Sequence, residues 1–368
     1  MVTVSGVIER LEAATPLSKA AGWDPVGLQL GDPDAPAGRV AVCHEVTEDV
    51  MEAVAAEPVD LLVTYHPLLF RPTTAFVAGR SPAGRAYRLA RAGTAVFVVH
   101  TAFDTAPGGA ADAMAEALGL RDTVGLGPSW GEDAVKVVTF APPESAHAIV
   151  EAMAGAGAGS IGGYRACSFR SEGAGSFLAG EATHPVRGTA GATHSEAETR
   201  IEMVAPAARR DAVVAALVAA HPYEEPAYDT YAVSSNAGFA GRRGLVEPVT
   251  LGELAASSVA ALDAEGCRVA GPRRAVVERV AVVPGSGASF ISHAAASADV
   301  LVTGDVSHHQ AQEALARGLA VVDVGHVAGE RPGVRRLYAA VLDVAPGARS
   351  LLDLDPSPWK DPGPSKEA

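Results

Sequence analysis

The sequence has few cysteines, and none is placed like part of a disulfide framework or a thiolate metal site. Its 368 residues include only Cys43, Cys167 and Cys267, which lie far apart and show no CxxC spacing. Disulfide scaffolds and structural zinc sites need paired or closely spaced cysteines. With 48% hydrophobic residues, the chain can instead bury a sizeable core, and we expect it to work in a reducing compartment.

The sequence also lacks a stretch rich in Lys and Arg. The 29 basic residues stand against 43 Asp and Glu, which leaves a formal net charge of −14. Proteins that follow a phosphate backbone concentrate basic residues on one face, so we expect no nucleic-acid partner. An acidic chain can still bind a phosphorylated small molecule where a metal or free backbone N–H groups supply the attraction.

Long apolar runs are missing as well. No run reaches the ~18 residues that a membrane-spanning helix needs. The first 23 residues show an amphipathic helical pattern, without the basic start and apolar block of a secretory signal. We therefore predict a cytoplasmic protein that has no membrane partner.

Short apolar runs that alternate with helical stretches dominate both ends of the chain. Near-continuous Val and Leu runs of this kind are typical of buried parallel strands. They are RVAVCHEV, DLLVTYHP and TAVFVVHTAFD in the first third, and RVAVVPGSG, ADVLVTGD and LAVVDVGH near the end. The pattern predicts an α/β protein with mostly parallel sheets flanked by helices. Its two halves are residues 1–128 and 242–356, and residues 357–368 are predicted to be a disordered tail.

Residues 129–241 follow a different pattern and predict an inserted domain. VKVVTFAP and RIEMVAP are each followed by an amphipathic helical stretch, ESAHAIVEAMAG and ARRDAVVAALVAAH. A duplicated strand-and-helix unit of this length indicates a ferredoxin-like α+β sandwich. The segments GAGAGSIGG and THPVRGTAGATHSE are expected to form its long loops.

Ionisable residues follow several of the predicted strands, at the sheet end where ligands bind in open α/β folds. His66 follows one strand, and His100 and Asp104 follow another. His326 and Glu330 have helical i, i+4 spacing and so share one helix face. Taken singly, such residues are more often surface histidines or a solvated helix face. Together they form a set of N and O ligands that suits Zn, Fe, Mn or Ni.

Several ordered motifs closely resemble the NIF3 family, whose members are often named GTP cyclohydrolase I type 2 homologues. In the two halves the motifs are GLQLGDP (Gly27–Pro33), TYHPLLF (Thr64–Phe70), HTAFD (His100–Asp104), TGDVSHHQAQEA (Thr303–Ala314) and DVGHVAGE (Asp323–Glu330). Two further motifs resemble the PII/CutA-like domain inserted in longer members. These are GAGSIGGYRACSF (Gly157–Phe169) and HPYEEPAYDTY (His221–Tyr231).

The resemblance implies a toroidal homohexamer with a two-metal site in each protomer. The implied ligands are His66, Asp104, His326 and Glu330, the last bridging the metals. Two departures from the family pattern stand out. Tyr65 occupies a position where the family usually has a metal-binding His, and Pro25 follows Asp24 where Asn is usual. One metal, a weakened second metal, or a substitute ligand are all compatible with Tyr65, and His44 is the candidate substitute.

Other residues are expected to line the site. His309 matches the family motif, and we predict that it or His100 acts as general acid or base. The turn Gly285-Ser286-Gly287 and the nearby Asp305 are predicted to bind substrate, because free N–H groups before a helix can hold a phosphate. The ordinary alternatives are a plain first helical turn at His309 and tight packing at the glycines.

Two function classes remain open from the sequence. A metal-dependent hydrolase is favoured, and the family name implies GTP as its small-molecule substrate, with opening of the purine imidazole ring. The alternative is a non-enzymatic metal-binding scaffold or regulatory protein, which the Tyr65 departure favours. We expect one or two divalent metals in each subunit.

Overall fold

The computed structural model describes residues 2–130, 134–161, 164–183, 185–233, 238–354 and 357–359. The chain divides into two compact units, which we call the core unit (1–131 and 238–368) and the insert unit (132–237). Sequence patterning predicted the insert at 129–241. Apart from residues 357–359, the tail that was predicted to be disordered lies outside the described residues.

The first sheet of the core unit consists of short apolar strands. In order across the sheet they are β1 (Gly27–Leu30), β4 (Ala95–Val98), β3 (Leu61–Thr64), β2 (Val40–Cys43) and β15 (Arg349–Ser350). All are parallel except β1, which joins β4 antiparallel. Alternate residues face opposite sides of a sheet, so Val40 and Val42 enter one apolar cluster while Ala41 and Cys43 enter another. Both faces are therefore buried.

The second sheet of the core unit is mixed rather than mostly parallel, which corrects the prediction for this half. Its order is β11 (Arg268–Ala270), β14 (Ala320–Asp323), β13 (Val300–Gly304), β12 (Val276–Ser286), β10 (Gly238–Thr250) and β5 (Arg121–Trp130). The predicted parallel strands are β12, β13 and β14, which lie side by side in this sheet. β5 leads toward the insert and β10 returns from it, so these two pair antiparallel, and β10 also pairs antiparallel with β12.

The helices of the core unit begin at recognisable capping residues. Ser307 accepts the N–H of Gln310, and Thr250 forms a capping box with Glu253. The N-terminal helix is shorter than the amphipathic pattern of the first 23 residues. It ends at Glu12, and Pro16 precedes a separate 3₁₀ turn. The α-helices are α1 (Val4–Glu12), α2 (Glu48–Ala56), α3 (Pro82–Ala92), α4 (His100–Thr105), α5 (Ala110–Ala117), α8 (Leu251–Leu262), α9 (Ile291–Ala295), α10 (His308–Ala316) and α11 (His326–Val344). Short 3₁₀ turns are η1 (Leu17–Lys19) and η4 (Ala288–Phe290).

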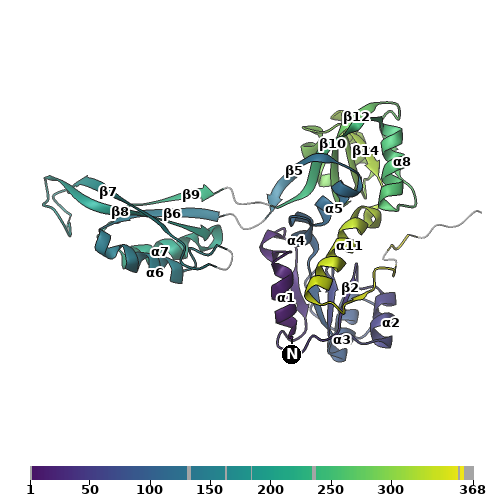
Figure 1. The fold of residues 1–368 in the computed structure, drawn as a ribbon, viewed down its shortest axis with the longest axis horizontal. Helices are drawn as coiled ribbons and strands as arrows, with labels where there is room; N and C mark the ends of the chain where they lie inside the picture. Colours follow the sequence, from purple (N-terminus) through teal and green to yellow (C-terminus); the bar gives the residue numbers. More distant parts are fainter. Residues whose placement is uncertain are drawn as a thin grey trace, which may run out of the picture. The chain divides into compact units, whose positions relative to one another are not determined.

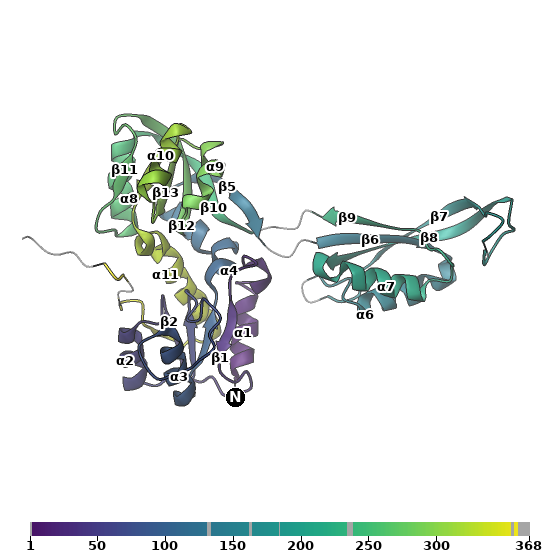
Figure 2. The ribbon, with the colours of Figure 1, turned by 180° about the vertical axis from the view of Figure 1, so that it is seen from behind.

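Helix α11 connects the two sheets of the core unit. Its residues contact β12 and β13 of the second sheet and β2 of the first, and both views of the ribbon show it running between them (Figures 1 and 2). Val334, Leu337 and Val341 belong to the apolar cluster under the first sheet, whereas Ala328 belongs to the cluster under the second. The first turn of α11 is thus held beside the ends of strands from both halves of the sequence. Within the described residues, none of the helices has the length and apolar character to cross a bilayer.

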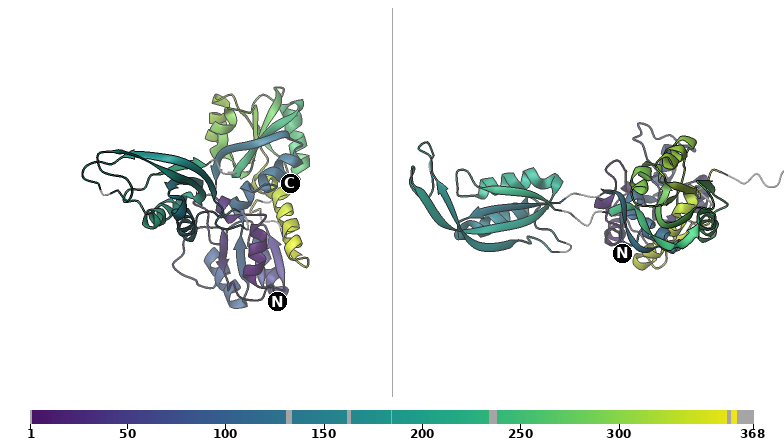
Figure 3. Two further views of the ribbon diagram at one scale, coloured as in Figure 1. Left: turned by 60° about the vertical axis from the view of Figure 1, so that its left-hand side comes forward. Right: turned by 90° about the horizontal axis from the view of Figure 1, so that it is seen from above.

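The insert unit has a βαββαβ order. Its elements are β6 (Ala134–Ala141), η2 (Pro143–Ser145), α6 (Ala146–Gly155), β7 (Phe169–Leu178), β8 (Thr193–Pro206), η3 (Ala207–Arg209), α7 (Arg210–Ala220) and β9 (Tyr228–Val233). The antiparallel sheet has the order β7-β8-β6-β9, and α6 and α7 lie together on one of its faces (Figure 3). One loop prediction is wrong at its end, because residues 193–196 begin β8.

Candidate metal centre

Two adjacent parallel strands deliver two imidazoles. His44 follows β2 and His66 follows β3, and the carbonyl of His44 accepts the backbone N–H of His66 at 2.9 Å. The hydroxyl of Thr64 also bonds to both of their carbonyls, at 3.3 and 2.9 Å. This backbone pairing stacks the two rings, with centroids 5.1 Å apart. Thus His44, which the sequence offered only as a substitute, lies directly beside the predicted ligand His66.

The first turn of α11 delivers the third imidazole and a carboxylate. The helix begins at His326, as predicted, and the Nε2 atom of His326 lies 3.1 Å from Oε1 of Glu330. The preceding Gly325 has φ +84°, a left-handed conformation that favours glycine, and its N–H is held by Asp323 at 3.0 Å. The tight turn directs the helix start back toward the strand ends.

These elements converge on Glu330, which is only 3% exposed. Its Oε2 atom lies 2.7 Å from Nε2 of His44 and 3.0 Å from Nε2 of His66. Ligand atoms of His44, His66 and Glu330 all fall within 4.8 Å of one another. Among the described residues, no Lys or Arg pairs with this carboxylate. Burial favours the neutral acid, but the charge of His66 and the imidazole hydrogen bonds hold the pKa of Glu330 well below its ordinary value.

A second carboxylate orients His326. Asp305 accepts a hydrogen bond from Nδ1 of His326 at 2.7 Å, which leaves Nε2 directed at Glu330. Asp305 itself has φ +57°, an unusual backbone conformation for a residue with a side chain. Burial lowers the pKa of His326, but Glu330 and Asp305 outweigh that effect and raise it to about 9. Carboxylate–histidine pairs of this kind orient metal ligands in many sites.

Gly285, predicted to bind substrate, has a steric reason to be glycine. A Cβ atom on Gly285 would lie 2.3 Å from Oε1 of Glu330, and its φ is +59°. The segment after it also differs from the predicted strand-to-helix turn. Strand β12 continues to Ser286, and the 3₁₀ turn η4 comes before the five-residue helix α9. Gly285 therefore makes room for the buried carboxylate.

Tyr65 and Asp104 form a buried pair next to the centre. The phenol of Tyr65, fully buried, donates a hydrogen bond to Oδ1 of Asp104. Burial and the nearby carboxylates raise the pKa of Tyr65 well above its ordinary value, and burial raises the pKa of Asp104 to about 6. Asp104 was expected after a strand, but it lies on the short helix α4. It stands outside the group whose ligand atoms lie within 4.8 Å of one another.

His100 is held by a residue whose role the sequence did not reveal. Oδ2 of Asp24 lies 2.9 Å from Nδ1 of His100, and it also accepts the N–H and hydroxyl of Thr101 at 3.0 and 2.5 Å. Despite its burial, these contacts lower the pKa of Asp24. The His100 ring centroid lies 5.0 Å from that of His66. The only sequence signal was the position of Asp24 in a family motif.

The centre opens into a cleft of about 1010 Å³ within the core unit. Four imidazoles line it, those of His44, His66, His100 and His326, together with the predicted Asp305. The remaining predicted residues are not part of this lining: Tyr65, Asp104, Gly285, Ser286, Gly287, His309 and Glu330. His309 is exposed on α10 beside His308, so its predicted acid–base role stays a prediction.

Comparison with known proteins assigns the family. A sequence model of the Duf34/NIF3 (NGG1p interacting factor 3) family matches residues 2–350. The chain belongs to the NIF3 family. It is 41% identical over 342 residues to a Mycobacterium tuberculosis protein named "GTP cyclohydrolase 1 type 2 homolog", covering 90% of this chain and 89% of that one. A Halalkalibacterium halodurans protein of the same name is 36% identical over 324 residues, 87% of each chain.

Solved structures of NIF3-like proteins share the fold. A Bacillus cereus protein related to NIF3 has a TM-score of 0.68 at 33% identity, covering 97% of this chain and 99% of that one. Staphylococcus aureus SA1388 has a TM-score of 0.76 at 23% identity, covering 98% of both chains. The mixed α/β fold and the family predicted from the motifs are therefore confirmed. The likeness of the insert to PII/CutA proteins stays a prediction.

Proposed function

We propose that this NIF3 protein is a divalent-metal-dependent hydrolase whose metal is held by His44, His66 and Glu330, with His326 completing the set. The observation that carries the proposal is the buried Glu330 carboxylate, which is surrounded by three imidazoles that themselves line a large cleft. Imidazole and carboxylate donors suit Zn, Fe, Mn or Ni. A buried carboxylate without Lys or Arg partners is also the group that a divalent cation neutralises best.

The residues around the centre can support hydrolysis once a metal is bound. A divalent metal supplies Lewis acidity and lowers the pKa of a coordinated water toward neutrality. His100 faces the cleft, and its contact with Asp24 raises the pKa of the imidazole despite burial. The protonated imidazole of His100 can therefore donate a proton to a leaving nitrogen of the substrate. We assign it the general-acid role in preference to the exposed His309.

The relatives' name supports a nucleotide or a related nitrogen heterocycle as substrate. Phe70 lines the cleft, and Trp23 lies edge-on to both Phe70 and His100, with centroids 6.1 and 6.3 Å away. Both aromatic side chains are largely exposed, at 61% for Trp23 and 51% for Phe70. Exposed rings beside a cleft offer a stacking surface for a planar base. GTP is therefore the first substrate to test.

The test uses metal-loaded full-length protein incubated with GTP and other nucleotides. We expect formate release and a changed ultraviolet spectrum, both abolished by Glu330→Ala. Glu247→Ala is the matched control, since Glu247 is an exposed residue that pairs with Arg121 on the surface. Loss of activity in the control, or turnover that persists in Glu330→Ala, would contradict the proposal.

The alternative function is a non-enzymatic metal-binding scaffold. The observation that favours it is the Tyr65–Asp104 hydrogen bond, which occupies a carboxylate that the family resemblance assigns to metal binding. Tight metal binding without turnover of any nucleotide would establish this alternative. The predicted homohexamer is checked on the same sample by light scattering.

A further inference from the structure

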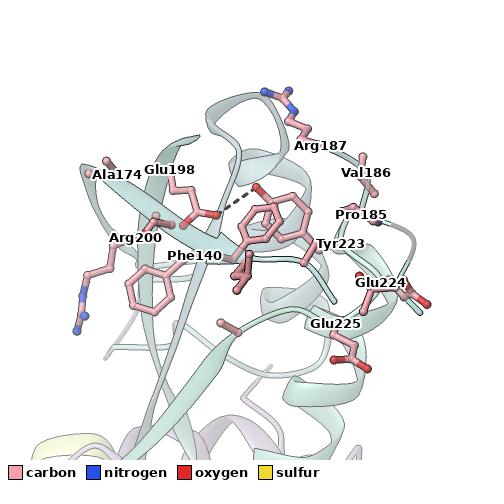
Figure 4. A pocket seen from close by; sticks show the side chains of 18 of the residues that line it. Phe140, Ala174, Pro185, Val186, Arg187, Glu198, Arg200, Tyr223, Glu224 and Glu225 are labelled. Carbon is pink, nitrogen blue, oxygen red and sulfur yellow. Dashed lines mark hydrogen bonds between the residues drawn. The ribbon is translucent and has the colours of Figure 1, made fainter. Parts of the chain in front are cut away.

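The insert unit contains a cavity of about 610 Å³, a size that suits a small organic molecule. It is lined by β7, by part of β8, by the loop after β7 and by residues 223–227 before β9. Figure 4 shows the Phe140 and Tyr223 rings among the labelled side chains around it. Phe177, Leu178 and Val186 add further apolar surface. The lining is thus mainly apolar, with a limited number of charged groups.

The basic groups of the lining are already neutralised from outside it. Arg187 forms ion pairs with Glu144 and Glu196, and Arg200 pairs with Glu202 at 2.8 Å. None of these three carboxylates lines the cavity. In Figure 4 both guanidinium groups point away from Tyr223. The arginines therefore leave little positive charge inside the cavity.

Four glutamates contribute to the lining: Glu172, Glu198, Glu224 and Glu225. Glu198 differs from the two arginines, because no cation from outside the lining neutralises it among the described residues. Among the described residues, no Lys or Arg forms an ion pair with Glu198. Its Oε1 atom accepts the phenol of Tyr223 at 3.1 Å, and its Oε2 atom lies where a Cβ on Gly175 would be, 2.0 Å away. A side chain at position 175 would therefore displace this carboxylate from its present place.

His221 fixes the ring that carries this contact. Its Nε2 atom lies 3.0 Å from the carbonyl of Phe140, and its Nδ1 atom accepts the N–H of Tyr223 at 3.1 Å. These two contacts select the neutral tautomer protonated on Nε2. The Tyr223 ring packs against His221, with centroids 5.0 Å apart. Phenol and carboxylate are therefore positioned before any ligand arrives.

We propose that this cavity binds a small organic cation, with an apolar body between Phe177, Leu178 and Val186 and an ammonium group held by Glu198 beside the Tyr223 ring. An ammonium is attracted both to a carboxylate and to an aromatic face. Anionic ligands are repelled by Glu198, because the two arginines are paired with carboxylates outside the lining. Neutral ligands of the same shape gain the apolar contacts but not the charge.

The experiment measures binding of three indole probes of similar shape to the full-length protein by isothermal titration calorimetry. Tryptamine carries an ammonium group, tryptophol a hydroxyl and indole-3-propionate a carboxylate on the same indole body. We expect saturable binding of one tryptamine per chain, binding of tryptophol weaker by about tenfold or more, and none of indole-3-propionate. Equal binding of tryptamine and tryptophol, or no saturable tryptamine binding, overturns the proposal.

Variants locate the site. Glu198→Gln keeps an acceptor for Tyr223 but removes the charge, so it should weaken tryptamine to the level of tryptophol and leave tryptophol unchanged. Glu151→Gln is the control, since Glu151 is exposed on α6 and lies outside the lining. Unchanged tryptamine binding in Glu198→Gln, or an equal loss in Glu151→Gln, overturns the assignment. The probe series on the unmodified chain tests the proposal even if a variant does not fold.

Discussion

The core unit and the insert unit each place a carboxylate among aromatic rings, but the partners of the two carboxylates differ. Glu330 is buried and is met by three imidazoles, those of His44, His66 and His326. Glu198 is half-buried and accepts a single phenol from Tyr223. Imidazoles can exchange their protons for a metal, whereas a phenol cannot do so near neutral pH.

This difference explains why similar acidic groups are assigned different ligands. In the core unit, metal binding replaces protons on a preformed set of N and O donors. In the insert unit, the described residues bring no three ligand atoms of His, Cys, Asp or Glu close together, but the Glu198 carboxylate can hold a single organic charge. The number and kind of neighbouring donors decide the ligand class, not the carboxylate itself.

The largest expected effect comes from removing one carboxylate at a time. Glu330→Gln should abolish stoichiometric metal binding, with an affinity loss above ~100-fold. Removing a direct metal ligand should lower the affinity at least as much as removing a residue that hydrogen-bonds to a ligand. Glu198→Gln should leave metal content unchanged. Elemental analysis after dialysis measures both. If Glu330→Gln kept the wild-type metal content, the proposed metal centre would be wrong, and so would the contrast drawn between the two units.

The next test reduces the number of imidazoles around Glu330 from three to two. His44→Ala should weaken metal binding by about 10- to 100-fold, since two imidazoles and the carboxylate remain. His308→Ala is the matched control, because His308 is exposed on α10 and does not line the cleft. Metal titration of both variants measures the loss. Identical affinity and stoichiometry in His44→Ala would show that its ring is only a packing neighbour.

A third test adds an imidazole. Tyr65→His removes the phenol that occupies Asp104 and places a nitrogen donor beside it, so we expect the metal content to rise from one toward two per chain. Tyr65→Phe keeps the ring without a donor and should stay at one. Because Tyr65 is fully buried, the metal-free His variant should lose roughly 1–3 kcal/mol of unfolding free energy. Two metals in the unmodified chain would contradict this expectation.

The elements that hold the site could be predicted because their signals are local. The runs that became β2, β3 and β4 bury both faces, and the spacing of His326 and Glu330 requires only one helical turn. Near-continuous apolar runs therefore identified the parallel strands without any alignment.

The parts that were missed depend on contacts between distant segments. The antiparallel pairing of β10 with β12 follows from the return path out of the insert, which no local pattern encodes. Likewise, the phenol of Tyr65 reaches Asp104 and the carboxylate of Asp24 reaches His100 only after folding. His44 was proposed from its position at a strand end, but its distance from Glu330 depends on where α11 lies.

The smallest expected effect concerns the pH dependence of the insert unit. Burial lowers the pKa of His221 in the folded state, whereas in the unfolded chain it titrates near ~6.5. The unfolded state therefore binds more protons below that pH. The contribution of neutral His221 to stability should be fully present above ~6.5 and should decline as the pH falls toward the lowered folded-state pKa.

Thermal unfolding of the full chain between pH 5 and 8 tests this prediction. His221→Asn, which cannot titrate, should flatten the decline on the acid side, whereas His147→Asn should not, because His147 is exposed on α6. Since His221 also orients Tyr223, tryptamine binding should weaken over the same pH range. An acid decline that is unchanged in His221→Asn would assign the pH dependence to other groups and leave the Tyr223–Glu198 contact independent of this histidine.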